Sequence, residues 1–125
     1  MAFAIGTLLT TAACGGGSGS SPTGPSSSSI SVPDPSTATS LTYTNNIAPI
    51  LQSDCTMCHN PTTRSFGYDF TTYAGVMQAV VPGSAQSRLV MATQPGGLMY
   101  GMFGATPTAK SATIYRWVVN FNAAQ

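Results

Sequence analysis

The chain has 125 residues and carries little charge, with four Lys and Arg against three Asp, a net charge of +1 and 6% charged residues. An ordinary soluble domain has about 25%. The four cations are scattered singly, whereas a phosphate-binding groove needs them clustered, so the composition argues against nucleic acid as a partner. Three isolated aspartates and no glutamate also argue against catalysis by a carboxylate pair.

Residues 2–13 form an apolar stretch that is too short for the roughly 20 residues of a bilayer span but typical of a secretory signal. Its ending, LTTAAC, resembles the cleavage and acylation site of bacterial lipoproteins. This resemblance implies a signal peptide at 1–13, lipid modification of Cys14, and export to a bacterial membrane. Gly15 implies the outer membrane, facing the periplasm or the cell surface. A signal peptide without lipidation is the alternative.

The segment that follows is rich in Ser, Gly, Pro and Thr and contains no aromatic residue up to position 40. Such a composition cannot bury enough apolar surface to offset its chain entropy, so residues 14–40 are predicted to be a flexible, disordered tether. Every aromatic residue except Phe3 lies beyond it. The core therefore belongs to residues 41–125, a small domain of a size that usually needs a covalent or cofactor staple.

Apolar residues in 41–125 recur at helical spacing with almost no strand alternation, which predicts an all-α fold. Helices are predicted around 47–51 with Thr44, Asn45 or Asn46 as N-cap, over 70–80 with Asp69 or Thr71, over 84–92 with Ser84, and from Pro107 through Phe121 with Thr106. Loops over about 60–68 and 93–105 separate them. Core positions are predicted for Tyr43, Tyr73, Met77, Met91, Tyr115 and Trp117.

The strongest motif is Cys55-Thr56-Met57-Cys58-His59. On one helical turn, sulfurs at i and i+3 point to the same side, as is needed to add across the two vinyl groups of one haem edge. The histidine that follows is then turned toward the iron. This pattern is typical of c-type haem attachment, and a covalent haem would also supply the core that so small a domain lacks.

Three other interpretations suit the motif less well. A thioredoxin-like redox pair needs a βαβ setting, which the helical pattern does not provide. A zinc site needs four ligands, but Cys58 and His59 are adjacent and no second His exists. A disulfide across two residues is strained and rare.

The segment YTNNIAPILQSDCTMCHN resembles the opening of class I monohaem cytochrome c domains of secreted and membrane-attached bacterial proteins. DFTTYAGVMQAVVPGSAQSRLV resembles their middle, and GGLM before a C-terminal helix resembles their ending. The resemblance covers nearly all of 41–125 and implies a helical domain wrapped around one covalent haem c. It implies Cys55 and Cys58 as thioether attachments, His59 as proximal ligand and Met99 as distal ligand. Tyr100 departs from the family, which usually has Pro there.

From the residues alone, the distal ligand is less narrowly defined. Met77 and Met91 have core spacing, and Lys110 would have to give up its proton to bind iron. The glycine-rich loop leaves Met99 and Met102, because its glycines allow the backbone to approach a ring closely.

The expected function is single-electron transfer between redox proteins through an exposed haem edge, without enzymatic chemistry. One alternative is a haem protein with an open or labile sixth position, acting as a gas sensor or a small peroxidase. Another is a structural unit of a haem-stacked assembly, because near-zero net charge favours self-association. Arg88 is either the partner of a haem propionate or a solvated surface residue.

Overall fold

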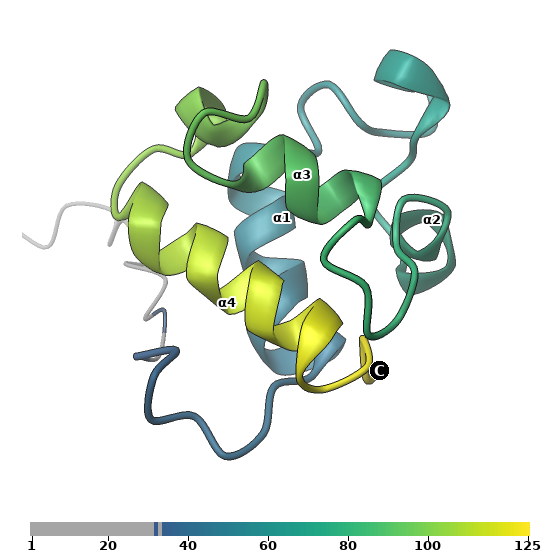
Figure 1. The fold of residues 1–125 in the computed structure, drawn as a ribbon. Coiled ribbons are helices and arrows are strands. Elements are labelled where there is room, and N and C mark those ends of the chain that lie inside the picture. The colour runs from purple at the N-terminus through teal and green to yellow at the C-terminus, as the bar shows by residue number, and fades with distance from the viewer. Residues whose placement is uncertain (1–31, 33) are drawn as a thin grey trace, which may run out of the picture.

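The computed structural model of the protein describes residues 32 and 34–125. The predicted signal peptide, Cys14 and most of the predicted tether lie outside these residues. The described chain is helical and contains no strand, so the all-α prediction is confirmed (Figure 1). In this part of the chain no helix is both long enough and apolar enough to cross a membrane.

The elements in chain order are the π-helical turn η1 (Tyr43–Ile47), α1 (Ala48–Asp54), the 3-10 turn η2 (Ser65–Gly67), α2 (Tyr73–Met77), α3 (Arg88–Thr93), the 3-10 turn η3 (Tyr100–Met102) and α4 (Pro107–Val119). η1 runs directly into α1, and α4 packs against both α3 and η1. The two short turns fall in the stretches predicted to be loops.

The first helical segment starts earlier than predicted, because its N-cap is Thr42. The Thr42 hydroxyl accepts from the backbone N–H of Asn45 at 3.4 Å, and the Asn46 side chain accepts from the Thr42 N–H at 3.0 Å. This reciprocal pair satisfies donors that a helix start leaves free. Pro49 lies in the first turn of α1, directly after the point where η1 passes into α1.

The second and third predicted helices are too long. Thr71 donates through its N–H and its hydroxyl to the Asp69 carboxylate, at 2.9 and 2.6 Å, and this turn holds Phe70 outside the helix. Thr72 is the N-cap, so α2 starts at Tyr73. Similarly, the Ser87 hydroxyl donates to the carbonyls of Val81 and Ser84, and α3 starts only at Arg88.

The last helix begins as predicted, with Thr106 as N-cap and Pro107 at the first helical position. It ends at Val119, so Phe121 follows the helix and packs on the core from a turn. Two of the predicted core positions are wrong. Met91 is 54% exposed and Tyr115 is 36% exposed, because each lies on the outer face of its helix.

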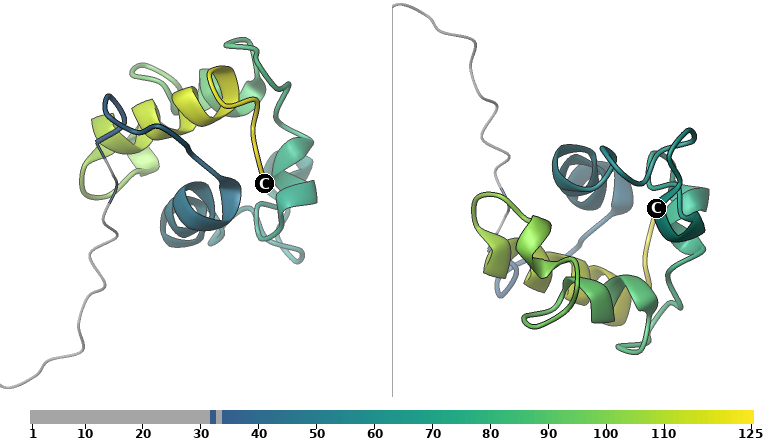
Figure 2. Two further views of the ribbon diagram at one scale, coloured as in Figure 1. Left: turned by 90° about the horizontal axis from the view of Figure 1, so that it is seen from below. Right: turned by 90° about the horizontal axis from the view of Figure 1, so that it is seen from above.

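The C-terminal segment joins the first and last helices. The Trp117 indole and the Tyr43 backbone N–H both donate to the carbonyl of Ala124, at 2.7 and 2.8 Å. The Tyr73 hydroxyl donates to the neighbouring Ala123 carbonyl at 2.9 Å. Figure 2 shows the C-terminal end between α4 and α2. Trp117 and Tyr43 are buried as predicted, so this junction closes the core.

The end of the segment predicted as tether contacts the helical domain. Arg116 of α4 donates to the carbonyl of Ala38 at 3.2 Å, and both Val32 and Ala38 pack against the core. Asp34 forms a side-chain turn with Ser36 just before this contact. Residues 34–40 therefore lie on the surface of the domain.

Candidate functional site

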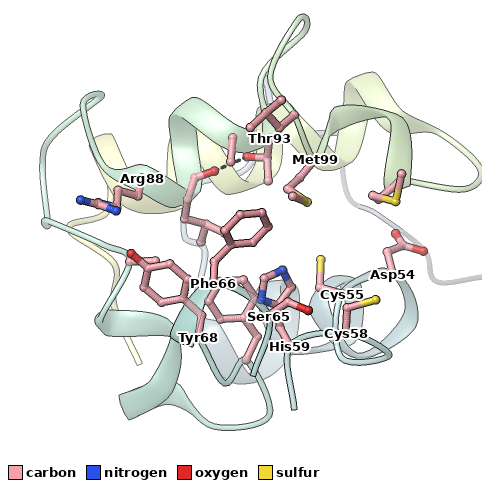
Figure 3. A pocket seen from close by; sticks show the side chains of 16 residues that line it. Asp54, Cys55, Cys58, His59, Ser65, Phe66, Tyr68, Arg88, Thr93 and Met99 are labelled. Carbon is pink, nitrogen blue, oxygen red and sulfur yellow. Dashed lines mark hydrogen bonds between the residues drawn. The ribbon is translucent and has the colours of Figure 1, made fainter. Parts of the chain in front are cut away.

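A cavity of about 400 Å³ opens between the end of α1, the chain around η2, the helix α3 and the loop that carries η3 (Figure 3). This volume lies in the range of roughly 300–1,000 Å³ found for small-molecule and cofactor sites. Most of the lining side chains are apolar. The apolar ones include Phe66, Tyr68, Phe70, Ala79, Leu89, Ala92, Leu98 and Met102. The cavity is also lined by the four residues predicted to hold a haem, Cys55, Cys58, His59 and Met99.

The Cys55–His59 motif forms one more helical turn at the end of α1. Cys55 is the C-cap and donates through its N–H to the Leu51 carbonyl at 2.8 Å. Cys58 and His59 in turn donate to the carbonyl of Cys55, at 3.2 and 2.9 Å. Both cysteines are free thiols, and Figure 3 shows them beside His59 on one side of the cavity. The local helical geometry expected from the spacing is therefore present.

Asn60 fixes this turn, although sequence analysis did not identify it. Its side-chain amide donates to the carbonyls of Thr56 and Met57, at 2.9 and 3.0 Å. Its side-chain oxygen accepts from the N–H groups of Thr62 and Thr63, each at 2.9 Å. An Asn directly after a helical turn is a known terminator, so its position beside the motif was the available signal.

The imidazole of His59 is buried, and its ring stacks on Phe70 with 4.6 Å between centroids and 25° between planes. The Phe70 N–H also donates to the His59 carbonyl at 2.8 Å. Within the described residues, Nδ1 of His59 is buried without a hydrogen-bond partner. Buried polar atoms are normally paired, so Nδ1 is an exception among the described residues, and the ring itself forms part of the cavity wall.

Met99 lies across the cavity from the cysteines and His59 (Figure 3). Its N–H donates to the Ala92 carbonyl at 2.8 Å, which fastens the loop to the end of α3. A Cβ on Gly97 would collide with the carbonyl oxygens of Met91 and Ala92, so the loop needs glycine there to approach α3. Met102 also lines the cavity but is 61% exposed.

Tyr100 departs from the cytochrome pattern in a way that the structure explains. Its backbone N–H donates to the Gly97 carbonyl at 3.2 Å, a bond that proline could not form. Its hydroxyl lies 3.0 Å from the hydroxyl of Thr108 on α4. The side chain therefore braces the loop after Met99 against the last helix.

A buried ion pair borders the same cavity, and sequence analysis did not predict it. Lys110 Nζ of α4 lies 2.6 Å from Asp54 Oδ2 at the end of α1, and the two side chains are only 7% and 10% exposed. Lys110, one of the alternative iron ligands, therefore faces Asp54. Burial raises the pKa of the neighbouring Cys55 thiol to about 12, with the Asp54 charge adding to the shift and Lys110 opposing it.

Arg88 is exposed at the first position of α3 and is the one Arg or Lys among the described residues lining the cavity. Figure 3 shows it on the opposite side of the view from Asp54.

The chain matches no protein-family model, no curated protein and no solved structure. Across residues 32 and 34–125, no three His, Cys, Asp or Glu side chains are grouped so that they could hold a metal ion.

Proposed function

We propose that this protein is a single-electron carrier with one covalently attached c-type haem in the cavity. Cys55 and Cys58 would form the thioether attachments, with His59 as the proximal ligand and Met99 as the distal ligand. One observation carries the proposal. The two thiols and the His59 imidazole line one side of an apolar cavity, and the Met99 side chain enters it from the opposite side.

The donor set suits this cofactor. When bound, haem supplies an iron that gains and loses one electron, and a His and Met pair of ligands raises its potential relative to two nitrogen ligands. Phe70 holds the His59 ring in place by stacking, and Asn60 holds the turn that carries both thiols. With His59 and Met99 both committed to the metal, no position is left for a substrate. This favours electron transfer over catalysis.

The proposed partners are redox proteins that make brief contacts at the cavity mouth. Phe66 and Leu98 line the cavity and are 78% and 83% exposed, so the mouth is apolar. Electron-transfer encounters use small interfaces, typically below about 1,200 Å². With so few charges on the chain, docking would be weakly steered by electrostatics and only slightly sensitive to salt.

We also propose that the domain is exported and held at a bacterial membrane by a lipid on Cys14. The support is the apolar run that ends in LTTAAC and the Ser-rich and Gly-rich segment that follows. Intact mass of the mature protein should show a chain starting at an acylated Cys14. Cys14→Ser should release the protein from membranes, and an unmodified start elsewhere would contradict the anchor without affecting the haem proposal.

The haem proposal is tested by expression in a periplasm that carries out cytochrome c maturation. Denaturing electrophoresis followed by peroxidase staining should retain haem on the wild-type band, and Cys55→Ala or Cys58→Ala should yield little holoprotein. An optical spectrum of the oxidised protein should contain the weak far-red band of sulfur-to-iron charge transfer. A colourless wild-type band would refute the proposal, and wild-type protein that binds carbon monoxide would favour a gas sensor or peroxidase.

A further inference from the structure

The ion pair between Asp54 and Lys110 lies where it can act on the bound group. Asp54 is the last residue of α1, immediately before the attachment residue Cys55, and its side chain lines the cavity. Lys110 reaches it from α4, 56 positions later in the chain, with Nζ 2.6 Å from Oδ2. Both side chains are almost fully buried. Asp54 is therefore part of the cavity wall, and its partner Lys110, which is not a lining residue, links that wall to α4.

A charge in such a buried position interacts strongly with a group bound in the cavity. Water screens a buried charge poorly, so its interaction with a neighbouring group is larger than on the surface. As long as the pair is intact, the carboxylate and the ammonium largely cancel at a distance. Removal of Lys110 leaves Asp54 as an uncompensated charge at the cavity wall, and removal of Asp54 leaves the Lys110 ammonium uncompensated just behind it.

We propose that the Asp54–Lys110 pair sets the reduction potential of the haem by neutralising the Asp54 carboxylate beside it, an inference that rests on the proposed function. Reduction adds one electron to the cofactor, which gains one negative charge. An unpaired Asp54 disfavours that change and lowers the potential. An unpaired Lys110 favours it and raises the potential.

The test is a potentiometric titration of the holoprotein, followed through the visible absorption of the reduced form. Lys110→Met should lower the midpoint potential and Asp54→Asn should raise it. The double variant Asp54→Asn/Lys110→Met should lie between them, because both charges are gone. Asp34→Asn is the matched control, since it removes the same charge from a surface turn outside the cavity lining, and it should leave the potential unchanged.

A shift in midpoint potential counts if it is at least about 18 mV. For one electron, this corresponds to a twofold change in the ratio of oxidised to reduced protein at fixed potential. Midpoints that move in the same direction in both single variants, or by less than this, would overturn the inference. A loosened fold alone would not produce opposite signs. If the Lys110→Met variant does not accumulate, the double variant is compared with Asp54→Asn. The double variant must have the lower midpoint potential, because the two proteins differ only in the Lys110 ammonium.

These outcomes are distinct from failure of the proposed function. Haem staining of the wild-type band tests covalent attachment. If the stain is retained but the potentials do not move as described, the protein is a cytochrome whose ion pair is only structural. If the wild-type band carries no haem, the proposed function and this inference both fall.

Discussion

The backbone N–H of Met99 donates a 2.8 Å hydrogen bond to the carbonyl of Ala92. This bond ties the loop that carries the proposed distal ligand to the end of α3, just where Gly97 lies against the carbonyls of Met91 and Ala92. The position of the Met99 sulfur is therefore governed by backbone contacts, and a substitution elsewhere in the loop should displace it.

Gly97→Ala should weaken or abolish the far-red sulfur band, because the added methyl group would collide with both carbonyl oxygens and push the loop off α3. Covalent haem should be retained, since the attachment turn lies on the other side of the cavity. Gly101→Ala is the matched control, because a Cβ there meets nothing within 4 Å. Equal spectra for the two variants would show that the loop does not position the ligand.

Met99→Ala should remove the same band and open the iron to carbon monoxide, as measured by optical spectra of the oxidised and reduced protein. Met102→Ala should leave the band in place, because that side chain is largely exposed at the mouth. The opposite pattern, with the band lost only in Met102→Ala, would show that the distal ligand is Met102 and not Met99.

The features that could be predicted from sequence are those whose signals are local. Thr106 and Pro107 mark the start of α4, and the spacing of Cys55 and Cys58 predicts a helical turn, because each signal acts within a few residues. The start of α2 could not be located, since Asp69 and Thr71 are both suitable caps by residue type. The two residues instead form a turn with each other, which moves the cap to Thr72.

Other features depend on how distant segments meet. The pairing of Asp54 with Lys110 requires α4 to cross the end of α1, and neither residue has a local pattern that indicates it. The residue type of Tyr115 predicts a core position. In the structure, Ile114 and Trp117 define the buried face of α4, and Tyr115 lies on the outer face. Residue type alone does not determine which side of a helix is covered.

In protein expressed without haem, the two thiols should differ in reactivity. Cys58 is exposed, whereas burial holds the pKa of Cys55 at about 12 instead of its ordinary 9.0. At pH 8 iodoacetamide should therefore alkylate Cys58 first, as measured by peptide mass spectrometry, because the thiolate is the reactive form.

The raised pKa of Cys55 also makes the stability of the fold depend on pH. Because the pKa of Cys55 is raised in the folded state, the native chain keeps this proton between about pH 9 and 12 while the unfolded chain loses it. The stability contributed by the neutral thiol is complete below about pH 9 and is lost as the pH rises toward 12. Cys55 alkylation should likewise keep rising over that range, and equal rates for the two cysteines at pH 8 would show that the unloaded chain is not folded around Cys55.

Tyr73→Phe should lower the free energy of unfolding by about 1 kcal/mol, because it removes the hydrogen bond from the hydroxyl to the Ala123 carbonyl. Chemical denaturation of the holoprotein measures the difference. Tyr115→Phe makes the same chemical change on the exposed face of α4 and should have almost no effect. A similar loss in both variants would contradict the structural role of the Tyr73 bond.

The bonds of Tyr43 and Trp117 to Ala124 also bear on the order of events during biogenesis. In the export that we propose, the mature chain crosses with its N-terminus leading, so the Cys55–His59 turn would reach the far side well before Ala124. Until the Ala124 carbonyl arrives, Tyr43 and Trp117 lack the shared acceptor that links the first helical segment to α4. Under the proposed function, the two thiols would be accessible to an incoming porphyrin during this interval, and the bonds to Ala123 and Ala124 would form after the cofactor is attached.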